Sequence, residues 1–139
     1  MSVGHRILPH TADLIIEAWA PTRAACLAEA VRAMVGTFAD TSNVAATEPI
    51  PVALEPAEDD AATLVALLDE VIYVVDALGA VPVSVELEES EDGGIGGFFD
   101  VARASAVRSI GPVPKAATYS DVSLEAGDDN WRCRITIDV

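Results

Sequence analysis

The first stretch of this chain with a clear structural signature is His10-Thr11-Ala12-Asp13-Leu14-Ile15-Ile16-Glu17-Ala18-Trp19. Its second part is a mostly apolar run that is typical of a β-strand, and its first four residues form a short polar motif. A matching strand is expected at the other end, in Trp131-Arg132-Cys133-Arg134-Ile135-Thr136-Ile137-Asp138-Val139. Apolar and polar residues alternate there, as they do when successive side chains point to opposite faces of a sheet. We expect these two strands to pair.

Pairing of the two strands would bring acidic groups together. Asp13 precedes the first strand, and Asp138 lies on the polar face of the last one, next to Val139 and its α-carboxylate. Like charges held this close repel, so either a proton or a divalent cation is expected to bind there. Two simpler interpretations remain open: Asp13 can cap a turn, and Asp138 can pair with Arg132 or Arg134.

The composition predicts one domain over residues 1–139 with an aliphatic core. Of its 139 residues, 51% are hydrophobic but only 5% are aromatic. The longest apolar helix candidate contains acidic residues, so no membrane span is expected, and the absence of a signal-peptide pattern predicts a cytoplasmic location. Cys26 and Cys133 are far apart and lack a neighbouring cysteine or histidine cluster, which favours two buried thiols over a disulfide or a zinc site.

The net charge of −15 argues against direct nucleic-acid binding, which requires lysine and arginine to displace the counterions of phosphate groups. A basic protein surface or a cation fits this charge better as a partner. Solubility, or adaptation to salt, would explain the acidity equally well. Lys115 is the only lysine in the chain, beside seven arginines.

Helix and strand signals alternate along the chain. A helix is predicted from Thr22, a good N-cap, and a short edge strand over 50–54 is bracketed by prolines. A second helix follows the acidic residues 58–60 and ends at Gly79. The remaining chain has the two-residue period of strands. The sequence therefore predicts an α+β fold, with two helices on a mostly antiparallel sheet of about six strands.

The glycine-rich segment 93–97 has two interpretations. Such segments can bind phosphate, but this one lacks the Gly-Lys-Ser/Thr ending and lies among acidic residues. A hairpin turn is therefore favoured over a phosphate loop.

Several motifs together resemble the archease family over essentially the full length of the chain. They are His10-Thr11-Ala12-Asp13 followed by a strand, an Asp-Thr loop after the first helix, Leu67-Leu68-Asp69-Glu70, Lys115-Ala116-Ala117-Thr118-Tyr119 and the final Ile137-Asp138-Val139. Each motif is weak alone, but the set occurs in the family's order and spacing.

The resemblance implies a non-catalytic protein that assists an RtcB-type RNA ligase in tRNA splicing or RNA repair. Archeases promote guanylylation of the active-site histidine of that ligase, which uses GTP and a divalent metal. The resemblance also implies a bound divalent metal, assigned in the family as calcium, with Asp13, Asp138 and an oxygen of Val139 as its ligands. Lys115 corresponds to the family's motif lysine. His10 is expected to orient the motif loop, because an all-oxygen ligand set suits calcium or magnesium better than zinc.

Two other functions compete with this one. A general chaperone-like binding module is consistent with the acidic surface. A metal-dependent hydrolase using Asp13 and Asp138 is disfavoured, because no nucleophile with a paired base and no nucleotide-binding loop is visible.

Overall fold

The computed structural model describes residues 2–10 and 13–139, with only the main chain described for Pro9 and His10. An antiparallel four-stranded sheet joins the two ends of the chain, in the order β1 (Gly4–His10), β2 (Asp13–Ala20), β9 (Trp131–Asp138) and β8 (Ala116–Ala126). A three-stranded antiparallel sheet has the order β4 (Glu48–Leu54), β6 (Ile95–Arg103) and β5 (Ala80–Glu89). The short strands β3 (Ala39–Asp40) and β7 (Arg108–Ser109) pair with each other.

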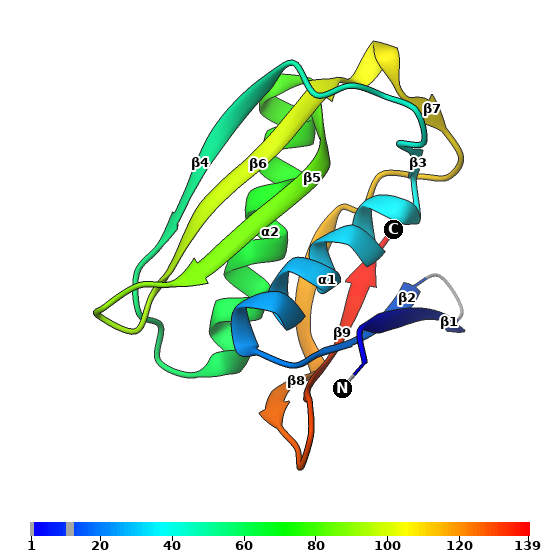
Figure 1. The fold of residues 1–139 in the computed structure, drawn as a ribbon. Helices are drawn as coiled ribbons and strands as arrows, with labels where there is room; N and C mark the ends of the chain where they lie inside the picture. Colours follow the sequence, from blue (N-terminus) through cyan, green and yellow to red (C-terminus); the bar gives the residue numbers. More distant parts are fainter. Residues whose placement is uncertain (1, 11–12) are drawn as a thin grey trace.

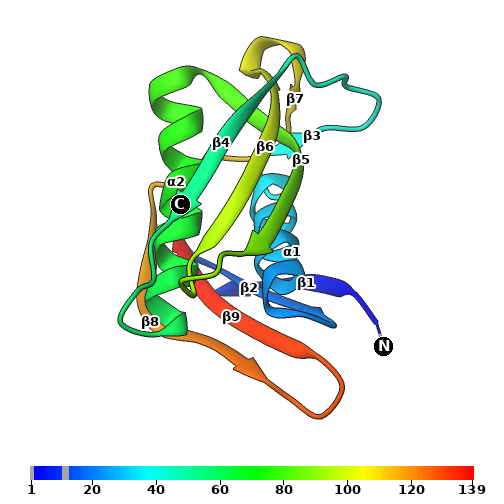
Figure 2. The same ribbon diagram turned by 60° about the vertical axis from the view of Figure 1, so that its left-hand side comes forward.

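Two helices, α1 (Arg23–Gly36) and α2 (Asp60–Leu78), lie between the two larger sheets (Figures 1 and 2). Both helices are preceded by an N-cap residue. The Thr22 hydroxyl accepts a hydrogen bond from the Ala25 N–H at 3.1 Å, and the Asp59 carboxylate accepts one from the Ala62 N–H at 2.8 Å. Gly79 ends α2 in the left-handed conformation, at φ 61°. The predicted start of α1 and both predicted ends of α2 are therefore confirmed, whereas α1 ends at Gly36 and leaves out Phe38, which the helical spacing had included.

The position of α1 explains its composition. It contacts β2 on one side and β5 on the other, so most of its circumference is buried. A helix buried all round is expected to be apolar all round, and α1 carries many alanines, which let both sheets approach its backbone. The core consists of aliphatic side chains from both helices and both sheets, together with the buried free thiols Cys26 and Cys133. The prediction of two core thiols is confirmed.

Arg23 joins three elements at the start of α1. Its Nε lies 2.8 Å from an Asp60 carboxylate oxygen on α2, and its Nη1 lies 2.8 Å from a Glu89 oxygen on β5. These two carboxylates raise the pKa of the Arg23 guanidinium, although burial opposes the shift, so it stays charged. The ion pairs fix the ends of both helices relative to the three-stranded sheet.

The predicted fold class is confirmed, but the described residues form nine strands rather than about six. β1 was not predicted from the sequence, because this edge strand has few apolar residues. β3 and β7 were not predicted either, since they have two residues each and are defined only by their distant pairing. In β5 a bulge at 82–84 interrupts the predicted alternation, and Gly96 and Gly97 belong to β6 rather than to the turn. The hairpin between β5 and β6 is confirmed.

Among the described residues, no helix combines the length and the apolar character needed to cross a membrane.

Candidate functional site

The two ends of the chain meet as predicted. In the antiparallel pairing of β2 with β9, Asp13 lies directly opposite Asp138 at the end of the ladder. The Cβ atoms of residues in this relation are about 4.5–5.5 Å apart and their side chains share one face of the sheet. Both residues are half-buried, as is Val139. The pairing places two carboxylates within reach of a single bound cation.

Lys115 lies beside this pair. Its main-chain N–H donates a hydrogen bond of 2.7 Å to the Asp138 carbonyl oxygen, and the residue is exposed. The next strand residue, Ala116, is the register partner of Asp138. Asp69 on α2 accepts a hydrogen bond from the Ala117 N–H at 3.3 Å, so this exposed carboxylate, to which the sequence assigned no chemistry, helps to fix the start of β8.

His10 is the last residue of β1 and the register partner of Asp13. Its side chain, together with Thr11 and Ala12, lies outside the described part of the chain. Its expected role in orienting the motif loop stays a prediction.

A row of alternating charges crosses the outer face of the four-stranded sheet. Glu17 pairs with Arg6 at 3.5 Å and with Arg134 at 3.2 Å, and Arg134 also reaches Asp121 at 3.4 Å. Arg134 therefore binds other carboxylates. Among the described side chains, Asp13 and Asp138 form no ion pair, and pairing of Asp138 with an arginine is not observed. No arginine or lysine side chain that the structure describes therefore neutralises the negative charge of the Asp13–Asp138 pair.

A shallow pocket of about 450 Å³ adjoins Asp13 on this outer face. Its rim includes Ser120 and Asp121, which belong to an irregular part of β8 where the register with β9 shifts between Thr118 and Ser123. Asp121 has a left-handed backbone, at φ 59°, which is uncommon for a residue other than glycine. Ser120 and Asp121 were not predicted as site residues from the sequence. The only signal for them was a polar Ser-Asp pair inside an otherwise strand-like segment.

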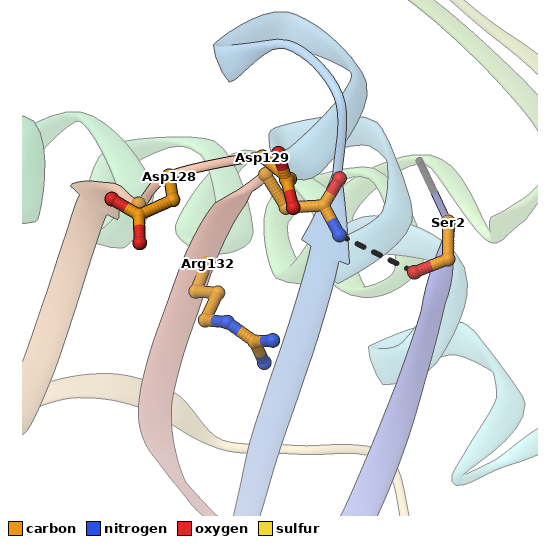
Figure 3. Close-up of a pocket in the computed structure, with 6 residues that line it drawn as sticks. Ser2, Asp128, Asp129 and Arg132 are labelled. Atoms are coloured by element: carbon orange, nitrogen blue, oxygen red, sulfur yellow. Dashed lines mark hydrogen bonds between the residues drawn. The ribbon is translucent and has the colours of Figure 1, made fainter.

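A larger pocket, of about 590 Å³, lies at the opposite end of β9 (Figure 3). It is formed by the β8–β9 turn and by Ser2, whose hydroxyl accepts a hydrogen bond from the Asn130 side-chain amide at 3.3 Å. Figure 3 shows Asp128, Asp129 and Arg132 around it. Of the candidate site residues whose side chains the structure describes, none lines this pocket.

The ligand chemistry of the candidate site fits a hard divalent cation. Among the described side chains, no group of three or more histidine, cysteine, aspartate or glutamate residues is arranged to hold a metal. Asp13 and Asp138 supply two carboxylates, and main-chain oxygens such as that of Val139 would have to complete the set. Calcium and magnesium accept such all-oxygen ligand sets, whereas zinc sites use histidine and cysteine.

These features define a class: a small α+β protein with two helices between antiparallel sheets and an acidic pair where its first and last strands meet. The sequence model of the Archease protein family (MTH1598/TM1083) matches residues 5–139. The "Probable protein archease" of Mycobacterium tuberculosis (strain ATCC 25618 / H37Rv) is 43% identical over 138 residues, which cover 99% of this chain and 76% of the relative. The chain belongs to the archease family.

More distant relatives agree. The "Protein archease" of Archaeoglobus fulgidus is 28% identical over 137 residues, which cover 97% of this chain and 98% of that one. The solution structure of Methanobacterium thermoautotrophicum protein 1598 superposes with a TM-score of 0.73 at 22% identity, covering 98% and 99% of the two chains. The crystal structure of a Thermotoga maritima archease, described as a possible chaperone, gives a TM-score of 0.68 at 18% identity, covering 95% and 94%. These two structures establish the shared fold.

Proposed function

We propose that this protein is a non-catalytic activator of an RtcB-type RNA ligase, and that it promotes guanylylation and repeated turnover of that ligase in tRNA splicing or RNA repair. Family membership supports this assignment. The observation that carries it is the cross-strand pair Asp13–Asp138, which has no cationic partner among the described side chains and lies beside Lys115.

In this proposal Asp13, Asp138 and a Val139 oxygen hold a divalent cation. We take it to be calcium, as the family resemblance implies, and an all-oxygen ligand set suits that ion. The cation would supply the positive charge that lets both carboxylates stay ionised in one fixed arrangement. The chain's own contribution is rigidity, because both aspartates are held by the β2–β9 ladder and Lys115 is held by its hydrogen bond to Asp138. A preorganised charged surface of this kind favours one conformation of a partner over others.

The decisive experiment measures guanylylation of an RtcB-type ligase from the same organism, with GTP and manganese, in the presence and absence of this protein. We expect acceleration by the wild type and loss of it in Asp13→Asn and Asp138→Asn. The matched control is Asp128→Asn, which removes one carboxylate from the far β8–β9 turn and should retain full activity.

Lys115→Glu tests the contact surface separately from the metal. We expect it to lower activation, because it reverses the only lysine charge next to the acidic pair. Activation that is unchanged in Lys115→Glu would exclude Lys115 as a contact. No acceleration by the folded wild-type protein would refute the proposal.

A second candidate function is the binding of incompletely folded proteins, motivated by the description of the Thermotoga relative as a possible chaperone. It predicts that the protein suppresses aggregation of unrelated, thermally unfolded clients and that Asp138→Asn suppresses it equally well. Aggregation that proceeds unchanged would exclude this function.

A further inference from the structure

The charges of this acidic protein are segregated along the chain. Residues 101–120 contain no aspartate or glutamate, although the chain has 23 acidic residues in all. The same segment carries Arg103, Arg108 and Lys115, three of the chain's eight basic residues. It leads from the end of β6 through β7 to the start of β8, on the outside of the molecule (Figure 1). It is therefore a basic strip on an otherwise acidic protein.

The cations of this segment are also unpaired. Arg6, Arg23, Arg32 and Arg134 each form ion pairs with carboxylates. Among the described side chains, the three basic residues of the segment form none. Arg108 has Asp40 as its register partner in the β3–β7 pair. Hydrogen bonds from Ser42, and to a smaller extent the charge of Arg108, lower the pKa of the Asp40 carboxyl, but the two side chains are too far apart for an ion pair. All three cations of the segment are exposed and can meet acidic groups of another molecule.

An apolar depression lies next to one of these cations, Arg108. It has a volume of about 160 Å³ and its lining is largely aliphatic and aromatic, with side chains that include Phe38, Val75, Val107 and Val113. The side chain of Arg108 belongs to the same rim. A cavity of this size and lining suits one aliphatic side chain of a partner.

The surface around the depression is unusually apolar for exposed positions. Ile110 is 52% exposed and Val113 is 39% exposed. On α2, Leu78 is 52% exposed and lies one turn after Val75, so it extends the same apolar surface. Large apolar side chains grouped around a depression mark interaction surfaces more often than isolated ones do. Here a cation, Arg108, lies at the same depression.

We propose that this surface, formed by segment 103–113 and the end of α2, binds an acidic peptide segment of a partner protein. An aliphatic side chain of that segment would enter the depression, and carboxylates beside it would face Arg103 and Arg108. The apolar lining favours a peptide over a nucleic acid, whose phosphates need many cations. The local cations must outweigh the repulsion from the net charge of −15, so binding is expected to be weak. The proposed surface does not include Lys115 or the acidic pair, so the inference does not depend on the proposed ligase function.

The test is a titration of the isotope-labelled full-length protein, followed by NMR amide shifts, with a short peptide of alternating leucine and glutamate. We expect shifts concentrated at Val75, Val107, Ile110 and Val113, with a dissociation constant below about 1 mM. The comparison probes are the same peptide with lysine in place of glutamate, the same peptide with serine in place of leucine, and oligouridylate.

Two variants locate the binding. Arg108→Glu reverses a rim charge and should weaken binding of the acidic peptide about tenfold. Ile110→Ser, at a position that is 52% exposed, should weaken it several-fold. The matched control is Arg132→Glu, the same charge change at another exposed arginine near the β8–β9 turn, which should change binding less than about twofold.

Three contrary results would overturn the proposal. No shifts with about 1 mM acidic peptide would exclude a peptide site of this chemistry. Equal weakening of binding by Arg108→Glu and Arg132→Glu would show that the change in affinity comes from the net charge of the protein and not from a local contact. Binding of oligouridylate at the same residues, without binding of the peptide, would make the strip a nucleic-acid site. Peptide binding that stays intact in Asp138→Asn, whether or not this variant activates the ligase, would support a surface separate from the acidic pair.

Discussion

Replacing Asp138 with asparagine should raise the stability of the metal-free protein. Asp13 and Asp138 are directly opposed across β2 and β9, and like charges in this position cost about 0.2–1 kcal/mol. Asparagine removes one charge and keeps the size of the side chain. For a chain of 139 residues, about 1 kcal/mol corresponds to a change in Tm of about 3 °C. In the presence of a chelator, the Tm of Asp138→Asn should therefore exceed that of the wild type by about 1–3 °C.

Calcium should invert this order. A cation that binds only the folded state stabilises it by about 2.7 kcal/mol when its free concentration is a hundred times the dissociation constant. This raises the wild-type Tm by about 8 °C. The variant retains only one of the two carboxylates, so calcium should stabilise it far less. The wild type should be the less stable protein in chelator and the more stable one in calcium.

The assay is thermal unfolding followed by circular dichroism, in chelator and across a calcium series. The control is Asp128→Asn, which removes a carboxylate from the β8–β9 turn, where Asp128 forms no ion pair with the described side chains. It should show the same calcium-dependent rise as the wild type. An equal rise in Asp138→Asn, or a lower Tm of Asp138→Asn in chelator, would refute the reasoning that a repulsive carboxylate pair holds the cation.

Three further predictions concern the fold. A Cβ at Gly97, where φ is +152°, would lie 1.9 Å from a main-chain oxygen of β5, so Gly97→Ala should lower the free energy of unfolding by about 3 kcal/mol or more. A Cβ at Gly36 would meet open space, so Gly36→Ala should raise the free energy of unfolding by about 0.5–1 kcal/mol. Urea titration of the two variants measures both changes. Cys26 and Cys133 are both buried, so both thiols should react with a disulfide reagent only at the rate of unfolding. Fast reaction in native buffer would contradict this. Arg23→Lys keeps the charge but loses the planar guanidinium group that joins two carboxylates, so it should lower the free energy of unfolding by about 1 kcal/mol. An unchanged urea midpoint would show that the guanidinium geometry contributes nothing to stability.

The sequence predicted the features of the fold that depend on local chemistry. Thr22 and Gly79 mark the ends of helices because capping and left-handed backbone are properties of single residues. The pairing of β2 with β9 was also predictable, because each of these strands has one clearly apolar face. The pairing of β3 with β7 was not, since two-residue strands carry no periodic pattern and form only when the rest of the fold brings them together.

In the candidate site, too, the residues set by local sequence were predicted and those set by long-range pairing were not. Asp13, Asp138 and Lys115 were predicted from motif and strand pattern, and the structure brings them together through the β2–β9 and β8–β9 pairings. Ser120 and Asp121 were not predicted, because their position beside the site depends on a register shift within β8. Such a shift reverses which side chains face outward, and a strand pattern read from sequence assumes that no shift occurs.

The two prolines of β4 limit how this protein can associate. β4 is an edge strand paired only with β6, and Pro49 and Pro51 occupy alternate positions in it. Proline has no N–H group, so in this ladder both must lie where the N–H would point away from β6. The exposed edge of β4 thus offers carbonyl oxygens as acceptors, with few N–H donors between them. A strand from another molecule would find no complete set of partners there, so this margin resists the edge-to-edge growth by which open sheets aggregate.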